Sequence, residues 1–144
     1  STFDVRSYRL QYADLRRAYG NDLKNYYVHY INWGAREGRR GTGCNTLQNG
    51  LTLWNGVDYS AVYDYSYYIS KNPDVYRAYG DDDAAVLQHF VQWGMKEGRQ
   101  AKVDFSVQNY RTRYQDLQKT YGSDWKAYYL HYINYGVREG RRGA

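Results

Sequence analysis

The chain has 144 residues, including 20 Tyr, 4 Trp and 3 Phe, and its formal net charge is +5. This length suits one compact domain or a short array of repeats. No apolar run reaches the roughly 20 residues that a bilayer-spanning helix needs, and a single cysteine, Cys44, excludes an internal disulfide. The moderate positive charge favours polyanionic partners only weakly.

One long pattern occurs three times, in residues 3–40, 63–100 and 105–142, which align without a gap. A period near 40 residues is typical of helical units that stack on one another. We therefore predict an all-α fold of three tandem repeats with about three short helices each, packed as one compact unit and forming a single repeat module over residues 1–144. The positions shared by all three repeats include Tyr8/Tyr68/Tyr110, Asp14/Asp74/Asp116, Tyr19/Tyr79/Tyr121, Gly20/Gly80/Gly122 and Asp22/Asp82/Asp124.

Helix boundaries follow from local residues. Asp4 and Asp64 are suited to cap a first helix over about residues 5–12 and 65–72. Pro73 suits the first position of a second helix, and Gly80 its left-handed end. Asp22, Asp82 and Asp124 then cap a third helix, which Gly34, Gly94 and Gly136 end. On that third helix, apolar spacing predicts one face made of Leu23, Tyr27, Tyr30 and Ile31.

Residues 41–62 do not repeat and form an insert between repeats one and two. Their many Gly and Asn residues favour a loop or an extended connection. The insert also contains Leu47, Leu51, Leu53, Trp54 and Val57, which is too apolar for a free linker. We therefore expect it to lie along the helices and to cover part of their surface.

Each repeat contains one histidine: His29, His89 or His131. A zinc site needs three or four ligands, and one histidine per repeat does not supply them. Catalysis would need a positioned nucleophile or acid nearby. We therefore interpret each histidine as a half-buried structural residue that donates a hydrogen bond to the neighbouring turn, and we expect no metal, cofactor or catalytic residue. The Glu-Gly-Arg motif that follows predicts a salt-bridged turn, in which Arg39, Arg99 and Arg141 bond the last carbonyls of a helix.

Aromatic and basic residues are the candidates for binding. An aromatic ring can either fill the seam between repeats or stack on the C–H bonds of a sugar. Trp54 and Tyr59 lie outside the repeats and are the preferred ligand contacts. The remaining candidates are Tyr26, Trp33, Trp93, Tyr128, Tyr135, Arg40 and Arg142.

Nucleic-acid binding is a weaker alternative. Arginine with interleaved tyrosine is the composition of single-strand platforms. Against this, 15 acidic residues are scattered through the same segments, including Asp81–Asp83, and the sequence has no Lys-rich tail and no RRM-like or helix-turn-helix pattern. We therefore expect no nucleic-acid partner.

The segment "FDVRSYRLQYADLRRAYG", with "HYINYGVREGRR", resembles tandem helical repeats of secreted and surface proteins of Gram-positive gut anaerobes. These repeats often accompany cell-wall hydrolases such as lysozyme-type muramidases. The chain departs from that pattern at Ser106, where Asp is usual, and at Ala13 and Gln115, where Pro is usual; we expect these changes to weaken a helix cap and a helix break.

The resemblance implies a secreted or cell-surface, non-catalytic module that binds cell-wall glycan or another polysaccharide. It also implies fusion to a catalytic domain, and the abrupt ends of the chain likewise lead us to expect a piece of a longer protein. We expect a monomer. The alternatives are a structural or protein-docking array without glycan affinity and, as a weaker one, an enzyme.

Overall fold

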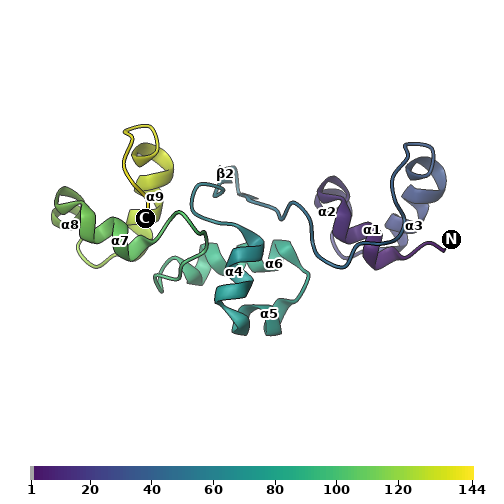
Figure 1. Ribbon diagram of the computed structural model, residues 1–144, viewed down its shortest axis with the longest axis horizontal. Helices are drawn as coiled ribbons and strands as arrows, with labels where there is room; N and C mark the ends of the chain where they lie inside the picture. The colour runs from purple at the N-terminus through teal and green to yellow at the C-terminus, as the bar shows by residue number, and fades with distance from the viewer. Residues whose placement is uncertain (1) are drawn as a thin grey trace. The chain divides into compact units, whose positions relative to one another are not determined.

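The computed structural model describes residues 2–144 and confirms the all-α fold class (Figure 1). Each repeat contains three seven-residue helices followed by a five-residue π-helical turn. Repeat one comprises α1 (Val5–Gln11), α2 (Ala13–Tyr19), α3 (Leu23–His29) and the turn η1 (Tyr30–Gly34). Repeat two comprises α4 (Tyr65–Lys71), α5 (Pro73–Tyr79), α6 (Asp83–His89) and η2 (Phe90–Gly94). Repeat three comprises α7 (Val107–Arg113), α8 (Gln115–Tyr121), α9 (Trp125–His131) and η3 (Tyr132–Gly136).

The chain forms two compact units, Ser1–Leu51 and Thr52–Ala144. Unit one holds repeat one and the first half of the insert, and unit two holds the second half of the insert with repeats two and three. The single module over residues 1–144 stays a prediction. Among the helices of residues 2–144, none combines the length and apolar character of a membrane span.

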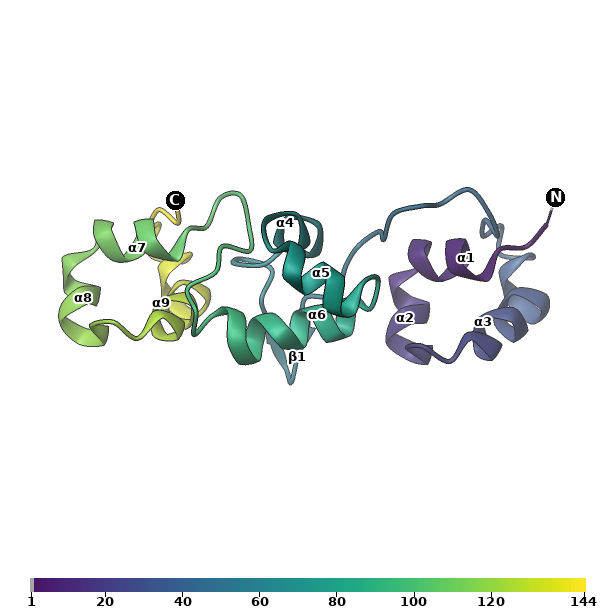
Figure 2. The ribbon, with the colours of Figure 1, turned by 90° about the horizontal axis from the view of Figure 1, so that it is seen from below.

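Each repeat closes on itself. In repeats one and three the middle helix joins the first and third helices, which lie on opposite sides of the repeat (Figure 2). The start of each repeat is also bonded to its end, because the amide of the first helix cap donates to a carbonyl just past the Glu-Gly-Arg motif. These bonds, each 2.8 Å long, run from Asp4 to Gly41, from Asp64 to Ala101 and from Ser106 to Gly143.

The predicted helix ends are largely confirmed. Asp4 and Asp64 accept amide hydrogens from the first turns of α1 and α4. Ser106, expected to weaken the cap of α7, accepts from the Asn109 amide at 3.2 Å, so serine caps here as aspartate does. The break between α1 and α2 forms without proline, because the backbone of Tyr12 is extended.

The third-helix caps are confirmed only in part. The Asp82 carboxylate accepts from the Ala85 amide at 3.1 Å, as predicted. The Asp22 carboxylate instead accepts from the Asn25 side chain at 2.9 Å, and neither Asp22 nor Asp124 makes a side-chain cap bond.

The core of repeat one is built from tyrosine rings. Tyr8 and Tyr26 are fully buried and form a cluster with Leu15. The Tyr8 ring meets the Phe3, Tyr12 and Tyr30 rings at centroid distances of 5.2, 5.2 and 5.1 Å. Buried tyrosines need hydrogen-bond partners, and the Tyr26 hydroxyl donates to the Gly20 carbonyl at 2.6 Å.

The third helix does not stop at its histidine but widens into the π-helical turn. Gly34 ends this turn directly against the hydroxyl of Tyr8, where a Cβ atom would overlap the hydroxyl oxygen. Gly94 and Gly136 face Tyr68 and Tyr110 in the same way. Glycine is therefore required because the hydroxyl of the first helix approaches the backbone of the turn.

The insert covers helices, as predicted. Its first half crosses repeat one, where the Gln48 amide donates to the Leu10 carbonyl at 2.9 Å and Leu47 is buried. Arg16 fixes this crossing, because its guanidinium donates to the carbonyls of Leu10 at 2.8 Å and Asn49 at 3.0 Å.

In the second half of the insert, the sequence analysis missed a small hairpin of β1 (Leu53–Trp54) and β2 (Val57–Asp58). Asn55 and Gly56, both with positive φ, make its two-residue turn.

Repeats two and three pack together within unit two. Tyr129 of α9 is fully buried there, and its ring meets the Phe90 ring at 5.5 Å while its hydroxyl donates to the Arg99 carbonyl. The indole of Trp125 lies against Gly98. The corresponding side chains of repeat one are more exposed: Leu23 and Tyr27 of α3 are 46% exposed, and Ile31 on the following turn is 75% exposed.

Candidate functional site

The same surface recurs on each repeat, beside the π-helical turn. An aromatic side chain projects from this turn in every copy: Trp33 is 51% exposed, and Trp93 and Tyr135 are each 54% exposed. Large aromatic side chains are normally buried, so half-exposed rings at one repeated position need an explanation. We call this surface the aromatic–histidine patch, formed by Tyr19, His29, Trp33 and Glu37, by Tyr79, His89, Trp93 and Glu97, and by Tyr121, His131, Tyr135 and Glu139.

A tyrosine of the first helix holds each histidine in place. The Tyr8 hydroxyl lies 2.8 Å from His29 Nδ1. The same distance separates Tyr68 from His89 and Tyr110 from His131. This bond runs to the first helix, 21 residues earlier in the chain, and not to the neighbouring turn as predicted.

The protonation states at this bond follow from burial. Burial raises the pKa of Tyr8 to about 12 and raises the pKa of Tyr68 and of Tyr110 in the same direction. The hydroxyls therefore remain protonated at neutral pH and can donate to histidine Nδ1. Nε2 then carries the ring hydrogen.

In repeats one and three the histidine lies between two aromatic rings and a carboxylate. In repeat one the His29 ring is 5.8 Å from the Trp33 ring and 6.2 Å from the Tyr19 ring. His29 Nε2 faces Glu37 at 4.0 Å. Repeat three has the same arrangement, with 5.7 Å between the His131 and Tyr135 rings and 3.9 Å between His131 Nε2 and Glu139.

Burial, followed by the charge of the nearby arginine, lowers the pKa of His89 and His131. The neutral ring is therefore the form favoured in these two repeats. The patch thus combines an aromatic face with an imidazole N–H donor and a carboxylate acceptor.

The arginine of the Glu-Gly-Arg motif has a structural role, in part as predicted. Arg39 donates to Glu37 at 2.8 Å, which confirms the salt-bridged turn. Its other nitrogens donate to both Asp14 oxygens at 3.0 and 2.8 Å, so the predicted bond to helix carbonyls is replaced by an ion pair with α2. The arginine hydrogen bond lowers the pKa of Asp14, and the same arrangement lowers those of Asp74 and Asp116.

A second basic residue of each repeat lies beside the exposed ring. Lys96 Nζ is 5.6 Å from the centre of the Trp93 ring, and the Arg138 guanidinium carbon is 5.8 Å from that of Tyr135. Arg36 occupies the equivalent exposed position of repeat one. The patches of repeats two and three therefore carry a cation next to the aromatic face.

Three of the predicted binding residues are core residues, which corrects the sequence analysis. Tyr26 and Tyr128 are fully buried, and both hydroxyls bond to the glycine that ends the second helix. Tyr59 is 5% exposed, with its ring against Phe90. No ring face is therefore left for a ligand at these positions. For Tyr26 and Tyr128 the prediction failed because helical spacing alone does not distinguish the inner flank of the third helix from the outer one.

The other predicted residues lie at or near the surface. Trp33, Trp93 and Tyr135 are the exposed rings of the three patches. Trp54 is partly buried on β1. Arg40 and Arg142 are exposed, and their backbone amides donate to the hydroxyls of Tyr12 and Tyr114 at 2.7 and 2.6 Å.

Sequence reasoning missed the tyrosines that complete the patch, Tyr19, Tyr79 and Tyr121, and those that hold the histidine, Tyr8, Tyr68 and Tyr110. Both sets occupy positions shared by all repeats, and that identity was the available indication of a role.

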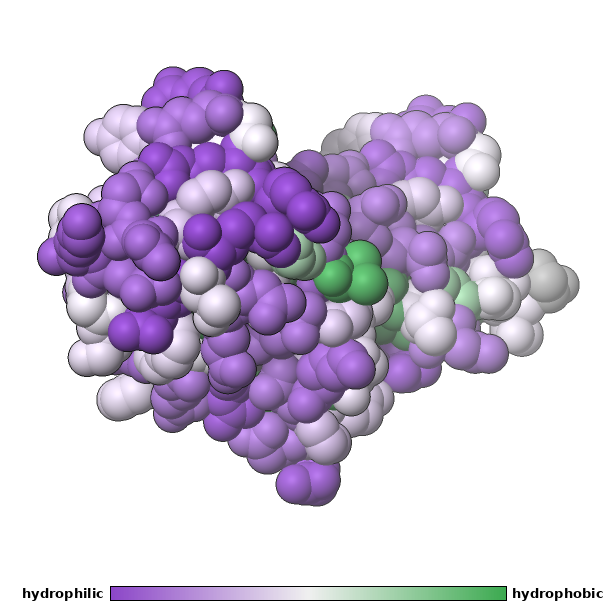
Figure 3. Space-filling view, turned by 60° about the vertical axis from the view of Figure 1, so that its left-hand side comes forward, coloured by the Kyte–Doolittle hydropathy of each residue, from purple (hydrophilic) through white to green (hydrophobic). Residues whose placement is uncertain are grey.

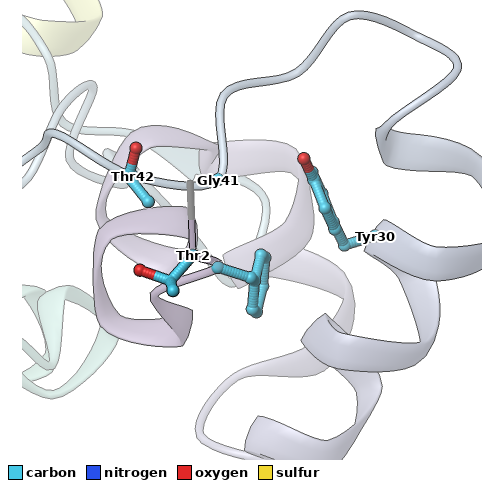
Figure 4. Close-up of a pocket in the computed structure, with 5 residues that line it drawn as sticks. Thr2, Tyr30, Gly41 and Thr42 are labelled. Atoms are coloured by element: carbon cyan, nitrogen blue, oxygen red, sulfur yellow. The ribbon is translucent and has the colours of Figure 1, made fainter.

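A small hollow in unit one is a poorer candidate. It has a volume of about 110 Å³ and is lined by Thr2, Phe3, Tyr30, Gly41 and Thr42 (Figure 4). Pockets for organic ligands usually measure roughly 300–1,000 Å³, so this hollow is too small for a sugar ring.

On one face of the molecule, most atoms are coloured hydrophilic or near-neutral, with few strongly apolar side chains (Figure 3). Open patches of amphipathic aromatic residues fit this surface better than an enclosed pocket does.

Comparison with family models, with curated proteins and with solved structures found no match to this chain. The assignment of function therefore depends on the geometry of the aromatic–histidine patches.

Proposed function

We propose that the chain is a non-catalytic module that binds a polysaccharide through its three aromatic–histidine patches. The observation that carries this proposal is the half-exposed ring at the same position in each repeat, which lies beside a fixed histidine in repeats one and three. The electron-rich ring face attracts the C–H bonds of a sugar. The imidazole N–H and the Glu37 carboxylate, or their equivalents, provide a donor and an acceptor for the sugar hydroxyls at the edge of the ring.

The open form of the patches favours a long polymer over a single sugar. One exposed ring with two polar groups binds a monosaccharide weakly, whereas a polymer can occupy several patches at once. Linked sites raise the apparent affinity by roughly 10²–10⁴-fold when the geometry allows simultaneous binding. The cations Lys96, Arg138 and Arg36 further favour a polymer with acidic groups, as cell-wall glycans have. In this proposal the module holds an attached hydrolase close to cell-wall glycan.

A sedimentation assay with purified peptidoglycan and with insoluble polysaccharides tests the proposal. The chain should be retained by at least one of them at moderate salt. A variant combining Trp33→Ala, Trp93→Ala and Tyr135→Ala should bind at least about 10-fold more weakly, because it loses all three stacking faces. Each single variant should lose only a few-fold.

Tyr76→Ala is the matched control, because Tyr76 is 45% exposed on α5 and lies outside the patches. It should bind like the parent chain. High salt should remove binding that depends only on charge and should spare stacking. Failure of the parent chain to bind any glycan, or full binding by the triple variant, would refute the proposal and favour a docking array without glycan affinity.

A further inference from the structure

The contact between repeats two and three identifies the two surfaces through which one repeat binds the next. Repeat three contributes Trp125 and Tyr129 of α9. Repeat two contributes the Phe90 ring, the backbone of Gly98 and the Arg99 carbonyl. We call the first surface the docking face and the second the docking edge.

Repeat one carries the same docking face, but it is exposed. Tyr27 occupies the position of Tyr129 and is 46% exposed, whereas Tyr129 is fully buried. Leu23 occupies the position of Trp125 and is also 46% exposed, and Ile31 on the next turn is 75% exposed. Three apolar side chains on one helical flank form a patch of the kind that usually marks an interaction site.

Repeat three carries an exposed docking edge, and so does repeat one, where Gly38 lies in open space. Tyr132 occupies the position of Phe90, and Gly140 that of Gly98. Space is open around Gly140, whereas the Trp125 indole fills it at Gly98. On the same turn, Val137 is 49% exposed although its equivalent in repeat two, Met95, is fully buried.

We propose that the docking face of one copy of the chain binds the docking edge of a second copy, so that copies associate head to tail. By analogy with the contact inside unit two, the Tyr27 ring packs on Tyr132 of the second copy, and its hydroxyl donates to the Arg141 carbonyl. Leu23 covers Gly140 in the way that Trp125 covers Gly98. The two surfaces differ, so a pair of bound copies keeps a free face and free edges, and association continues into short filaments. This differs from the monomer expected from the sequence.

Analytical ultracentrifugation tests the proposal on the whole chain, with a reductant present to keep Cys44 reduced. Across about 10 µM to about 1 mM, the weight-average mass should rise above the 17.1 kDa of one chain. A face variant, Tyr27→Ala with Ile31→Asp, should remain monomeric. An edge variant, Ala35→Glu with Val137→Glu, should remain monomeric as well, since it blocks the open edges of both repeat one and repeat three. All four positions are exposed, so circular dichroism should show unchanged folding.

Mixing the two variants distinguishes head-to-tail binding from other modes. The face variant keeps its edges and the edge variant keeps its face, so an equal mixture should form small complexes that grow no further. Tyr76→Ala, at an exposed position outside both surfaces, should associate like the parent chain. A parent chain that stays monomeric throughout would overturn the proposal, as would self-association of the edge variant or a mixture that stays monomeric.

Discussion

Repeats one and three make the same internal contacts, yet the outer flanks of their third helices have different environments. The Tyr8–His29 and Tyr110–His131 bonds are both 2.8 Å long, and Arg39 and Arg141 reach their aspartates at the same distances. Tyr27 is nevertheless 46% exposed where the equivalent Tyr129 is fully buried. A repeat therefore determines its own geometry, whereas burial of its outer flank depends on a neighbour.

The largest expected effect comes from truncating these two tyrosines. Tyr129→Ala should lower the free energy of unfolding by about 3–5 kcal/mol, because it leaves a cavity between two repeats. Tyr27→Ala should cost less than about 1 kcal/mol, because much of its side chain is already in water. Urea titration followed by circular dichroism measures both. Equal losses of unfolding free energy for the two variants would show that the neighbouring repeat does not stabilise Tyr129.

Contacts inside a repeat should behave alike in every copy. Gly94→Ala should cost about 2–3 kcal/mol, because the new methyl group overlaps the Tyr68 hydroxyl and breaks its bond to His89. Gly34→Ala should have a similar cost through Tyr8. In the Tyr68→Phe background, Gly94→Ala should cost at least about 1 kcal/mol less, since the overlapping oxygen is gone. If the two substitutions lowered the free energy of unfolding additively, the Tyr68 hydroxyl would not be the reason for glycine at position 94.

Mild acid should weaken the fold through the buried histidines. The folded-state pKa values of His89 and His131 lie below the ordinary 6.5, so the unfolded chain takes up protons first as the pH falls. Stability should be full above pH 6.5 and decline below it. A further decline should follow below pH 3.8, where protonation neutralises the aspartate carboxylates that are paired with arginine.

Melting temperatures measured across this range test the effect. His131→Asn, which can still accept from Tyr110 but does not titrate, should show a smaller decline between pH 6.5 and 5 than the parent chain does. An unchanged decline would remove His131 from the explanation.

The smallest expected effect distinguishes repeat two from the others. Tyr63 occupies the position of Phe3 and Phe105, and its buried hydroxyl has no hydrogen-bond partner within residues 2–144. Tyr63→Phe should therefore be neutral or stabilise by up to about 1 kcal/mol. Tyr65→Phe is the control, since its hydroxyl donates to the Gly80 carbonyl at 2.8 Å and its loss should cost about 1 kcal/mol. Marked destabilisation by Tyr63→Phe would mean that its hydroxyl is satisfied.

Much of the fold could be predicted because its determinants are local. The caps Asp4 and Asp64 act within one helical turn, and Pro73 and Gly80 restrict their own backbone. The hairpin at Asn55 and Gly56 was also readable, since Asn-Gly is a common two-residue turn, but the surrounding glycines obscured it. The candidate site was predicted only in part: Trp33, Trp93 and Tyr135 are exposed, whereas Tyr26, Tyr59 and Tyr128 belong to the core.

The sequence by itself determined that three similar all-α repeats are present, where their helices begin and end, and which residue types the repeats share. Only the tertiary structure decided that the tyrosine of the first helix holds the histidine of the third, and which aromatic rings face water. Caps, turns and backbone preferences act over a few neighbouring residues and can be read from them. Exposure depends on surfaces brought together from distant parts of the chain, and tyrosine suits both a core and a surface, so its letter alone does not assign it to either.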